Sequence, residues 1–111
     1  MELVTLSEAK SYLRVDYSDE DALIGTLLTS ATELCVDVAR MSEAQWSDVK
    51  NESATSSYYT VAEISHIRSL MRVAVLYALA YLYEHREEAD HMVLTLTLRS
   101  ILFSVREAAN L

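Results

Sequence analysis

The stretch VAVLYALAYLYEHREEAD, residues 73–90, passes from an unbroken hydrophobic segment directly into a charged one. Every residue from 73 to 83 is hydrophobic, so a helix formed there is apolar on all sides. A membrane span needs about 20 apolar residues, whereas Arg72 and Glu84 close this run at both ends. We therefore predict a helix that is covered by protein rather than by lipid.

Two kinds of cover are possible for this helix. Its own chain could wrap it completely, as in the centre of a small helical domain. Alternatively, the few short helices of this chain leave part of it bare, and another copy of the chain or a docking protein covers the rest. The periodicity of residues 73–83 leaves both alternatives open.

The composition restricts the fold class. The 111 residues are 51% hydrophobic and 23% charged, with one glycine and no proline. Hairpins and tight turns depend on those two residues, so an all-β fold is not expected, and the length suits one modest core. We predict a single all-α domain over residues 1–111. It is expected to be a small bundle of about four helices, with two long antiparallel helices and an extended C-terminal arm.

Capping patterns place the helices of the first half. Thr5-Leu6-Ser7-Glu8 matches a capping box and predicts a first short helix. Ser18 is expected to cap a second helix near residues 19–39, with acidic residues in its first turn. This helix carries an apolar face formed by Ile24, Leu27, Leu28, Ala31, Leu34, Cys35 and Val38.

Similar signals continue into the second half. Residues 42–45, Ser-Glu-Ala-Gln, form a possible capping box and predict one or two helical turns. The small polar residues 51–57 predict a loop. Thr60, with Glu63 at the partner position, predicts a long third helix that runs to about Arg86.

The last segment carries two conflicting patterns. Residues 94–98, Leu-Thr-Leu-Thr-Leu, alternate like a strand. The spacing of a helical face is found instead at Leu98, Ile101, Leu102 and Val105. We predict a short extended arm that is followed by a terminal helix near residues 97–108.

The charge balance is strongly acidic. Nine Lys and Arg stand against seventeen Asp and Glu, which gives a net charge of −8. Phosphate backbones repel such a chain unless it carries a local basic patch, and its basic residues are scattered along the sequence. We expect no specific DNA binding, although an acidic surface suits a protein that DNA slides past.

The cysteine content and the first ten residues indicate the cellular compartment in which the chain is made. Cys35 is alone, so one chain can form neither a disulfide nor a cysteine metal cluster. Its apolar neighbours predict a buried, inert thiol. Residues 1–10, MELVTLSEAK, have neither a basic start nor an apolar stretch, so no signal peptide is predicted. We expect the chain to be made in the cytosol.

Two Glu-x-x-His patterns raise the possibility of a metal site. They are Glu63–His66 and Glu88–His91, and carboxylate-bridged di-metal bundles use two such pairs. One pair opens the long helix and the other lies beyond its far end, so we predict no metal site. The rejected alternative, a di-metal bundle, would bind iron or manganese. The chain lacks the glycines of a phosphate-binding loop and has no nucleophile elbow. We expect no cofactor and no enzymatic activity.

Three blocks of sequence carry a resemblance to a known family. TLSEAKSYLRVDYSDEDALI, residues 5–24, resembles the opening of the head–tail connector proteins of long-tailed bacteriophages, which are also described as head-completion or DNA-packaging proteins. LYEHRE, residues 82–87, is similar to the family's Leu-Tyr-Glu-Asn-Arg-Glu, with His85 where Asn is usual. LTLTLRSILFSVRE, residues 94–107, is similar to its closing segment. The matching positions of the first block are Thr5, Glu8, Ala9, Lys10, Tyr12, Leu13, Arg14, Val15, Asp16, Asp21 and Ile24.

The resemblance implies a structural subunit of a tailed phage or prophage. Such subunits assemble into a ring, around twelve copies in the family, beneath the portal protein, and they bind the next tail-side completion protein. DNA would pass through the ring without specific binding and without any membrane. The expected location is the head–tail junction of the virion, reached from the cytoplasm of the bacterial host. The alternative is a small non-enzymatic helical module that binds one protein partner, such as a regulator or adaptor.

Charged residues flank the apolar helix within the blocks that resemble the family, and the C-terminal arm begins near His91. We expect subunit or portal contacts at these places. The expected contact residues are Arg68, Arg72, Tyr83, Arg86, His91, Leu94, Leu96 and Leu98.

Overall fold

Helices form all the regular structure in residues 2–87 and 90–109, the part of the chain that the computed structural model describes. The helices are α1 (Leu6–Leu13), α2 (Asp21–Ala39), α3 (Glu43–Lys50), α4 (Val61–Glu84), α5 (Met92–Ile101) and α6 (Phe103–Ala109). The predicted all-α class is confirmed. The prediction of about four helices is too low, because the C-terminal segment forms two helices and residues 43–50 form another.

Three helices begin at reciprocal capping boxes, as predicted. The hydroxyl of each cap residue accepts a hydrogen bond from the backbone N–H three residues later, and the side chain of that later residue accepts one from the cap N–H. The pairs are Thr5 with Glu8, Ser42 with Gln45 and Thr60 with Glu63. The starts of α1, α3 and α4 are therefore determined locally.

The start of α2 differs from the prediction. Its cap position is Glu20, which makes no side-chain capping bond, and Ser18 contributes only its carbonyl oxygen to the N–H of Asp21. The prediction that Ser18 caps this helix is wrong. The carboxylate of Glu20 is instead bound by Tyr83 and Arg86 at the far end of α4, so a tertiary contact positions this helix end.

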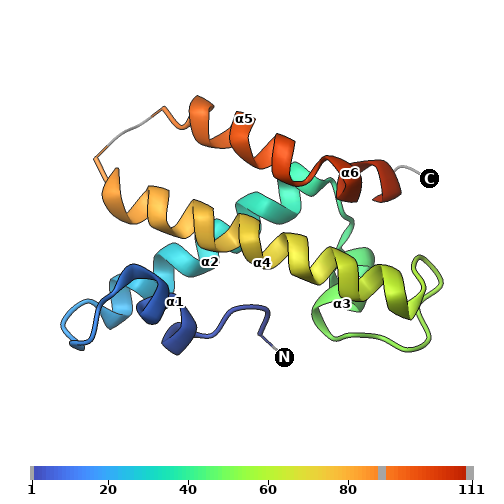
Figure 1. Ribbon diagram of the computed structural model, residues 1–111, viewed down its shortest axis with the longest axis horizontal. Coiled ribbons are helices and arrows are strands. Elements are labelled where there is room, and N and C mark those ends of the chain that lie inside the picture. Colours follow the sequence, from blue (N-terminus) through green and yellow to red (C-terminus); the bar gives the residue numbers. More distant parts are fainter. Residues whose placement is uncertain (1, 88–89, 110–111) are drawn as a thin grey trace.

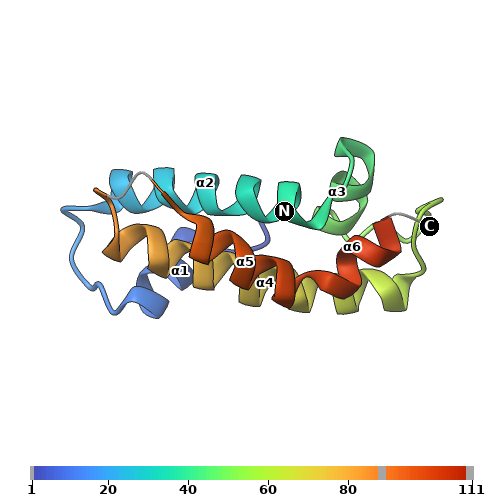
Figure 2. The same ribbon diagram turned by 90° about the horizontal axis from the view of Figure 1, so that it is seen from above.

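Helix α4 lies at the centre of the fold. It contacts α1, α2, α3 and α5, and its pairing with α2 is the most extensive in the molecule. In Figure 1, α5 lies along one edge of α4, α1 and α3 lie along the other, and α2 crosses behind it. The view from above shows α2 on one side of α4 and no helix on the opposite side (Figure 2). The molecule is accordingly thin, with extents of 42 × 28 × 18 Å.

The core lies between α2, α4 and the C-terminal helices. Its largest fully buried side chains are Ile24, Cys35, Val49, Met71, Val75, Leu79, Leu94, Leu98, Leu102 and Val105. By length and composition alone α2 could cross a membrane, but it packs on α1, α4, α5 and α6. Burial of Cys35 follows the sequence prediction.

The C-terminal segment is helical where an extended arm was predicted. Leu94 and Leu98, one turn apart on α5, are fully buried, whereas Leu96 between them is 53% exposed. Packing on α2 and α4 therefore selects the helical period over the two-residue alternation, because only that period buries one continuous face. The prediction of an extended arm is wrong.

Candidate assembly surface

Four of the predicted contact residues lie on α4 or directly after it, and each contacts other parts of the chain. Arg68 donates from Nη1 to the carbonyl oxygens of Val49 and Lys50, at 3.0 and 2.8 Å. Its Nε lies 3.3 Å from a carboxylate oxygen of Glu52. Carbonyl groups at a helix C-terminus lack partners within the helix and attract positive charge. Arg68 thus fastens the end of α3 to α4.

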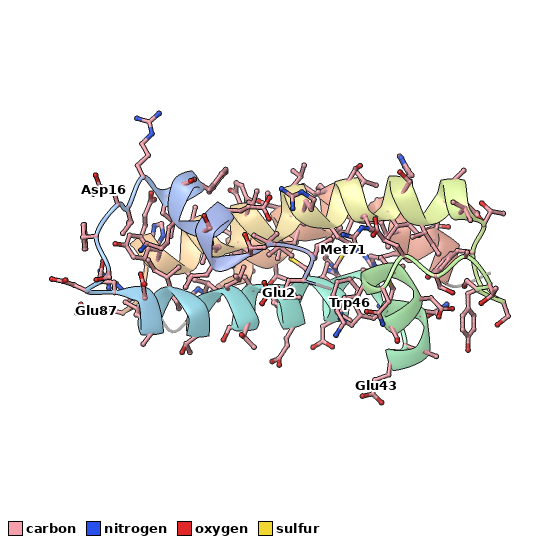
Figure 3. The ribbon with its side chains drawn as sticks, turned by 90° about the horizontal axis from the view of Figure 1, so that it is seen from below. Glu2, Asp16, Glu43, Trp46, Met71 and Glu87 are labelled. Atoms are coloured by element: carbon pink, nitrogen blue, oxygen red, sulfur yellow. The ribbon has the colours of Figure 1, made fainter. Side chains whose placement is uncertain are left out.

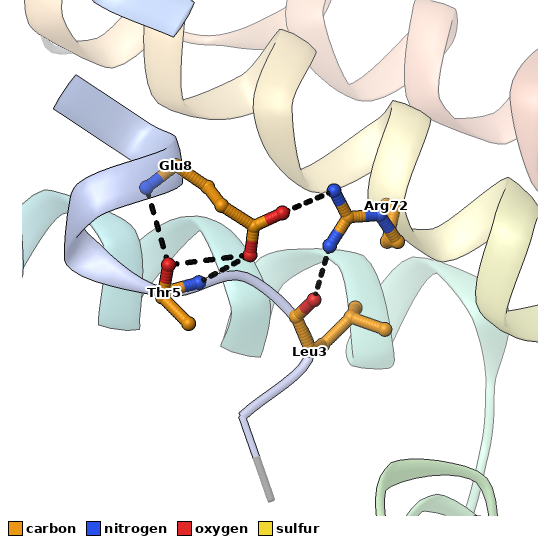
Figure 4. Close-up of polar contacts among 4 residues, drawn as sticks. All are labelled: Leu3, Thr5, Glu8 and Arg72. Atoms are coloured by element: carbon orange, nitrogen blue, oxygen red, sulfur yellow. Dashed lines mark hydrogen bonds and ion pairs between the residues drawn. The ribbon is translucent and has the colours of Figure 1, made fainter. Parts of the chain in front are cut away.

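Arg72 fastens the N-terminal segment. Its guanidinium donates to the carbonyl oxygen of Leu3 and to Oε2 of Glu8, both at 2.6 Å, as Figure 4 shows. The other oxygen of Glu8 accepts the backbone N–H of Thr5. The bond from Arg72, followed by the bond from Thr5, lowers the pKa of Glu8 from 4.5 to about 2. One arginine therefore holds both the segment before α1 and the first turn of α1.

Tyr83 and Arg86 fasten the start of α2. The Tyr83 hydroxyl donates to Oε1 of Glu20 at 2.5 Å, and Arg86 donates to Oε2 at 3.1 Å. The Arg86 guanidinium also lies 5.0 Å from the centre of the Tyr83 ring, within range of a cation–π contact. The bond from Tyr83 lowers the pKa of Glu20, with a further contribution from Arg86. The same bond raises the pKa of Tyr83 to about 12.

These contacts give Arg68, Arg72, Tyr83 and Arg86 a role within the subunit, which is to hold the first three helices and their flanking segments against α4. Contact with a partner stays a prediction for them. Sequence reasoning did not identify their acidic partners as ion-pair residues. Those partners are Glu8, Glu20 and Glu52. Only Glu8 gave a local signal, as part of a capping box.

The four predicted contact residues near α5 separate into two groups. Leu94 and Leu98 are fully buried and leave no exposed surface for a partner, which corrects their assignment. Leu96 points out of the fold, and His91 contacts the ring of Tyr81 edge-on at 5.8 Å. Of this segment, Leu96 and His91 retain surface at which a partner contact is predicted.

The apolar stretch of α4 is not fully covered by its own chain. Ala74, Val75, Ala78 and Leu79 are completely buried. Val73 is 57% exposed and Tyr77, one turn later, is 39% exposed. The chain therefore does not wrap α4 completely. We call the exposed part of this helix the α4 face (Val73, Tyr77).

A second exposed apolar surface lies on α5. It consists of Met92, Val93 and Leu96, which we call the α5 ridge. Between α4 and α6, a groove of about 280 Å³ is lined by apolar atoms of Ile67 and Val105. Large exposed apolar side chains that are grouped in this way mark surfaces that bind protein.

The candidate chemistry has no geometric support in the described residues. That part of the chain contains no group of three or more His, Cys, Asp or Glu placed to hold a metal ion. Glu63 caps α4, and its predicted partner His66 is exposed. The second pattern lies partly outside the described residues, because it includes Glu88. Burial raises the pKa of the Cys35 thiol to about 12, which keeps it protonated at neutral pH.

Comparison with known proteins identifies one family. The model of the family described as phage gp6-like head-tail connector protein matches residues 3–110. The match contains the three resembling blocks and also residues 41–60, which carried no resemblance of their own. No curated protein and no solved structure matches the chain significantly.

Proposed function

The chain belongs to the phage gp6-like head-tail connector family, and we propose that it is a ring-forming subunit beneath the portal. The family is structural and indicates a component of the head–tail junction that associates with portal and tail proteins. The proposed ring lengthens the DNA channel and joins the head to the tail. The copy number expected from the resemblance is about twelve.

One observation supports the ring most directly, namely the bare α4 face. Val73 and Tyr77 are exposed in an apolar stretch whose other residues are buried or partly buried, at the centre of the fold. Burying apolar surface contributes about 25 cal/mol per Å², so a partner that covers these side chains and the α5 ridge gains free energy. A neighbouring copy is the proposed cover, as in a closed ring.

The subunit is built for such a role. The antiparallel α2 and α4 form its proposed core, and the contacts of Arg68, Arg72 and Glu20 hold the remaining N-terminal parts against α4. A rigid subunit loses little conformational freedom on assembly. The net charge of −8 suits a channel that DNA traverses without specific binding.

The predicted contact residues keep two roles in this proposal. Leu96, with His91 beside it, contacts a neighbouring subunit through the α5 ridge. Arg68, Arg72, Tyr83 and Arg86 lie near the subunit or portal contacts that the first three helices make. All of residues 1–111 act as one domain, which assembles in the cytoplasm of the bacterial host and ends in the virion.

Deletion of the gene from its phage or prophage tests the proposal. We expect filled heads that fail to join finished tails or that lose their DNA. Normal virions from the deletion strain would defeat the proposal. The alternative of a small module that binds a single partner predicts normal virions together with a complex of fixed one-to-one composition. A matched strain that carries the gene elsewhere should restore infectious particles.

A further inference from the structure

The basic residues of this acidic chain fall into two groups. Four of the nine form ion pairs with described residues, namely Lys10, Arg68, Arg72 and Arg86. The remaining five basic residues form no ion pair with a described residue. They are Arg14, Arg40, Lys50, Arg99 and Arg106.

Three of the arginines without ion pairs lie together. Arg40 ends α2, Arg99 lies in the last turns of α5, and Arg106 lies in α6. They line one open depression of about 440 Å³ together with Asp37, the only carboxylate among its described lining residues. The Nε atom of Arg106 is buried and has no hydrogen-bond partner among the described residues. We call Arg40, Arg99 and Arg106 the basic cluster.

Negatively charged side chains are grouped at one end of the molecule. Asp16 and Glu87 lie at the same end in Figure 3, where the α1–α2 loop meets the segment after α4. In these two segments and the last residue of α4, the exposed carboxylates that form no ion pair with a described residue are Asp16, Asp19, Glu84, Glu87 and Asp90. We call these five residues the acidic end. Figure 1 shows this end at the left, and the junction of α5 and α6, next to the end of α2, somewhat right of the centre.

Grouped like charges repel one another, and an arginine that is partly buried without a partner loses hydration without compensation. A carboxylate-rich partner would remove both costs for the basic cluster. Its own acidic end cannot serve, because that end lies at one extremity of the molecule, whereas the junction of α5 and α6 lies away from it, past the middle of the long axis. A second copy of the chain presents that surface at the concentration of the protein itself.

We propose that the basic cluster of one copy binds the acidic end of the next copy. This inference rests on the proposed function and states which surfaces join the subunits. Because the two surfaces differ, the contact is head-to-tail. A pair of bound copies still has one free basic cluster and one free acidic end, so further copies can add at either side. A head-to-tail contact of this kind closes into a ring when the rotation between neighbouring copies is a whole-number fraction of a full turn.

The α5 ridge reinforces the contact. Met92 and Val93 come two and three positions after Asp90 in the sequence, so exposed apolar side chains lie close to the acidic end. Arg99 lies farther along the same helix, at the basic cluster. Apolar burial then adds to the affinity, while the contact depends on charge complementarity, which also selects the register and the partner.

Neutral variants test the proposal in sedimentation velocity at low salt. The wild-type protein should form a concentration-dependent series of oligomers, which weakens about tenfold when salt rises to physiological strength or above. Arg40→Gln/Arg99→Gln and Glu84→Gln/Glu87→Gln should each remain monomeric. A mixture of the two should form pairs and nothing larger, since only one intact contact can form between them.

Matched controls remove the same charge elsewhere. Lys50→Gln removes one positive charge away from both surfaces and is the control for Arg99→Gln alone, and Glu33→Gln/Glu43→Gln removes two negative charges elsewhere. Both control variants should assemble like the wild type. A wild-type protein that stays monomeric, or cluster variants that assemble normally, would overturn the proposal. The gene-deletion phenotype would be unaffected by either result, so the connector role is judged separately.

DNA is the other polyanion that the basic cluster could bind. A short duplex should bind the wild type and Arg40→Gln/Arg99→Gln equally weakly in a fluorescence anisotropy titration. If the arginine variant lost duplex binding while its oligomer distribution stayed like that of the wild type, the cluster would be a DNA contact. The head-to-tail assignment would then be wrong.

Discussion

Arg72 and Glu8, 64 positions apart in the sequence, are joined by an ion pair 2.6 Å long that ties the first helix to the middle of α4. The same guanidinium holds the carbonyl oxygen of Leu3. Leu3 and Val4 are buried beside it. A single side chain therefore decides how the N-terminal segment lies on the core.

Replacing Arg72 with Gln should destabilise the subunit and change its response to acid. Loss of the bond to Leu3 costs about 1 kcal/mol. The pKa of Glu8 is lowered from 4.5 to about 2, so its contribution to stability is present above pH 4.5 and disappears as the pH falls toward 2. The variant should show a smaller loss of stability across that interval, measured by urea unfolding. An unchanged acid response would show that Arg72 does not set this pKa.

The Tyr83–Glu20 bond predicts an alkaline effect. The pKa of Tyr83 is raised from 10.0 to about 12, so the stability that the protonated hydroxyl provides is complete below pH 10 and is lost as the pH rises through 12. An ultraviolet titration should contain a tyrosine step near pH 12, from the Tyr83 hydroxyl. Tyr83→Phe should remove that late step, and Tyr58→Phe should leave it in place.

Val73 and Val75 provide a matched pair on one helix. Val75→Ala should lower the free energy of unfolding by about 2 kcal/mol, because its side chain is completely buried. Val73→Ala should change it by less than about 0.5 kcal/mol, because Val73 is more than half exposed. On the proposed function, Val73→Ala combined with Tyr77→Ala weakens association between copies, measured by sedimentation. Normal association of that double variant would remove the α4 face from the interface.

The helix caps give a second matched comparison. Thr60→Ala removes a side-chain bond to the N–H of Glu63 and should cost about 1 kcal/mol in thermal or urea unfolding. Ser18→Ala removes no capping bond in the described structure and should be close to neutral. Equal losses for the two variants would mean that Ser18 caps α2 in solution after all.

The sequence predicted local features well where their cause spans about one helical turn. The capping boxes at Thr5, Ser42 and Thr60 involve residues three positions apart, so their partners are visible in the sequence. The Ser18 prediction failed because Glu20 is held by residues more than sixty positions away. The same reason explains why Glu8, Glu20 and Glu52 were not recognised as ion-pair partners.

The grouping of the basic residues could not be predicted from the sequence either. Arg40, Arg99 and Arg106 are scattered along the sequence, which indicated no basic patch, yet three different helices bring them to one depression. The Leu94–Leu98 segment is the converse case. Its sequence is compatible with a strand and with a helix, and packing against α2 and α4 selected the helix.

The amino-acid sequence by itself determined the all-helical class, the starts of three helices and the family, because these depend on neighbouring residues and on short blocks. Only the tertiary structure decided which side of α4 remains bare, which leucines of α5 are buried and which arginines meet. Those outcomes depend on how helices far apart in the chain share one small core. The few helices of this chain leave one side of the central helix α4 uncovered, so Val73 and Tyr77 stay exposed.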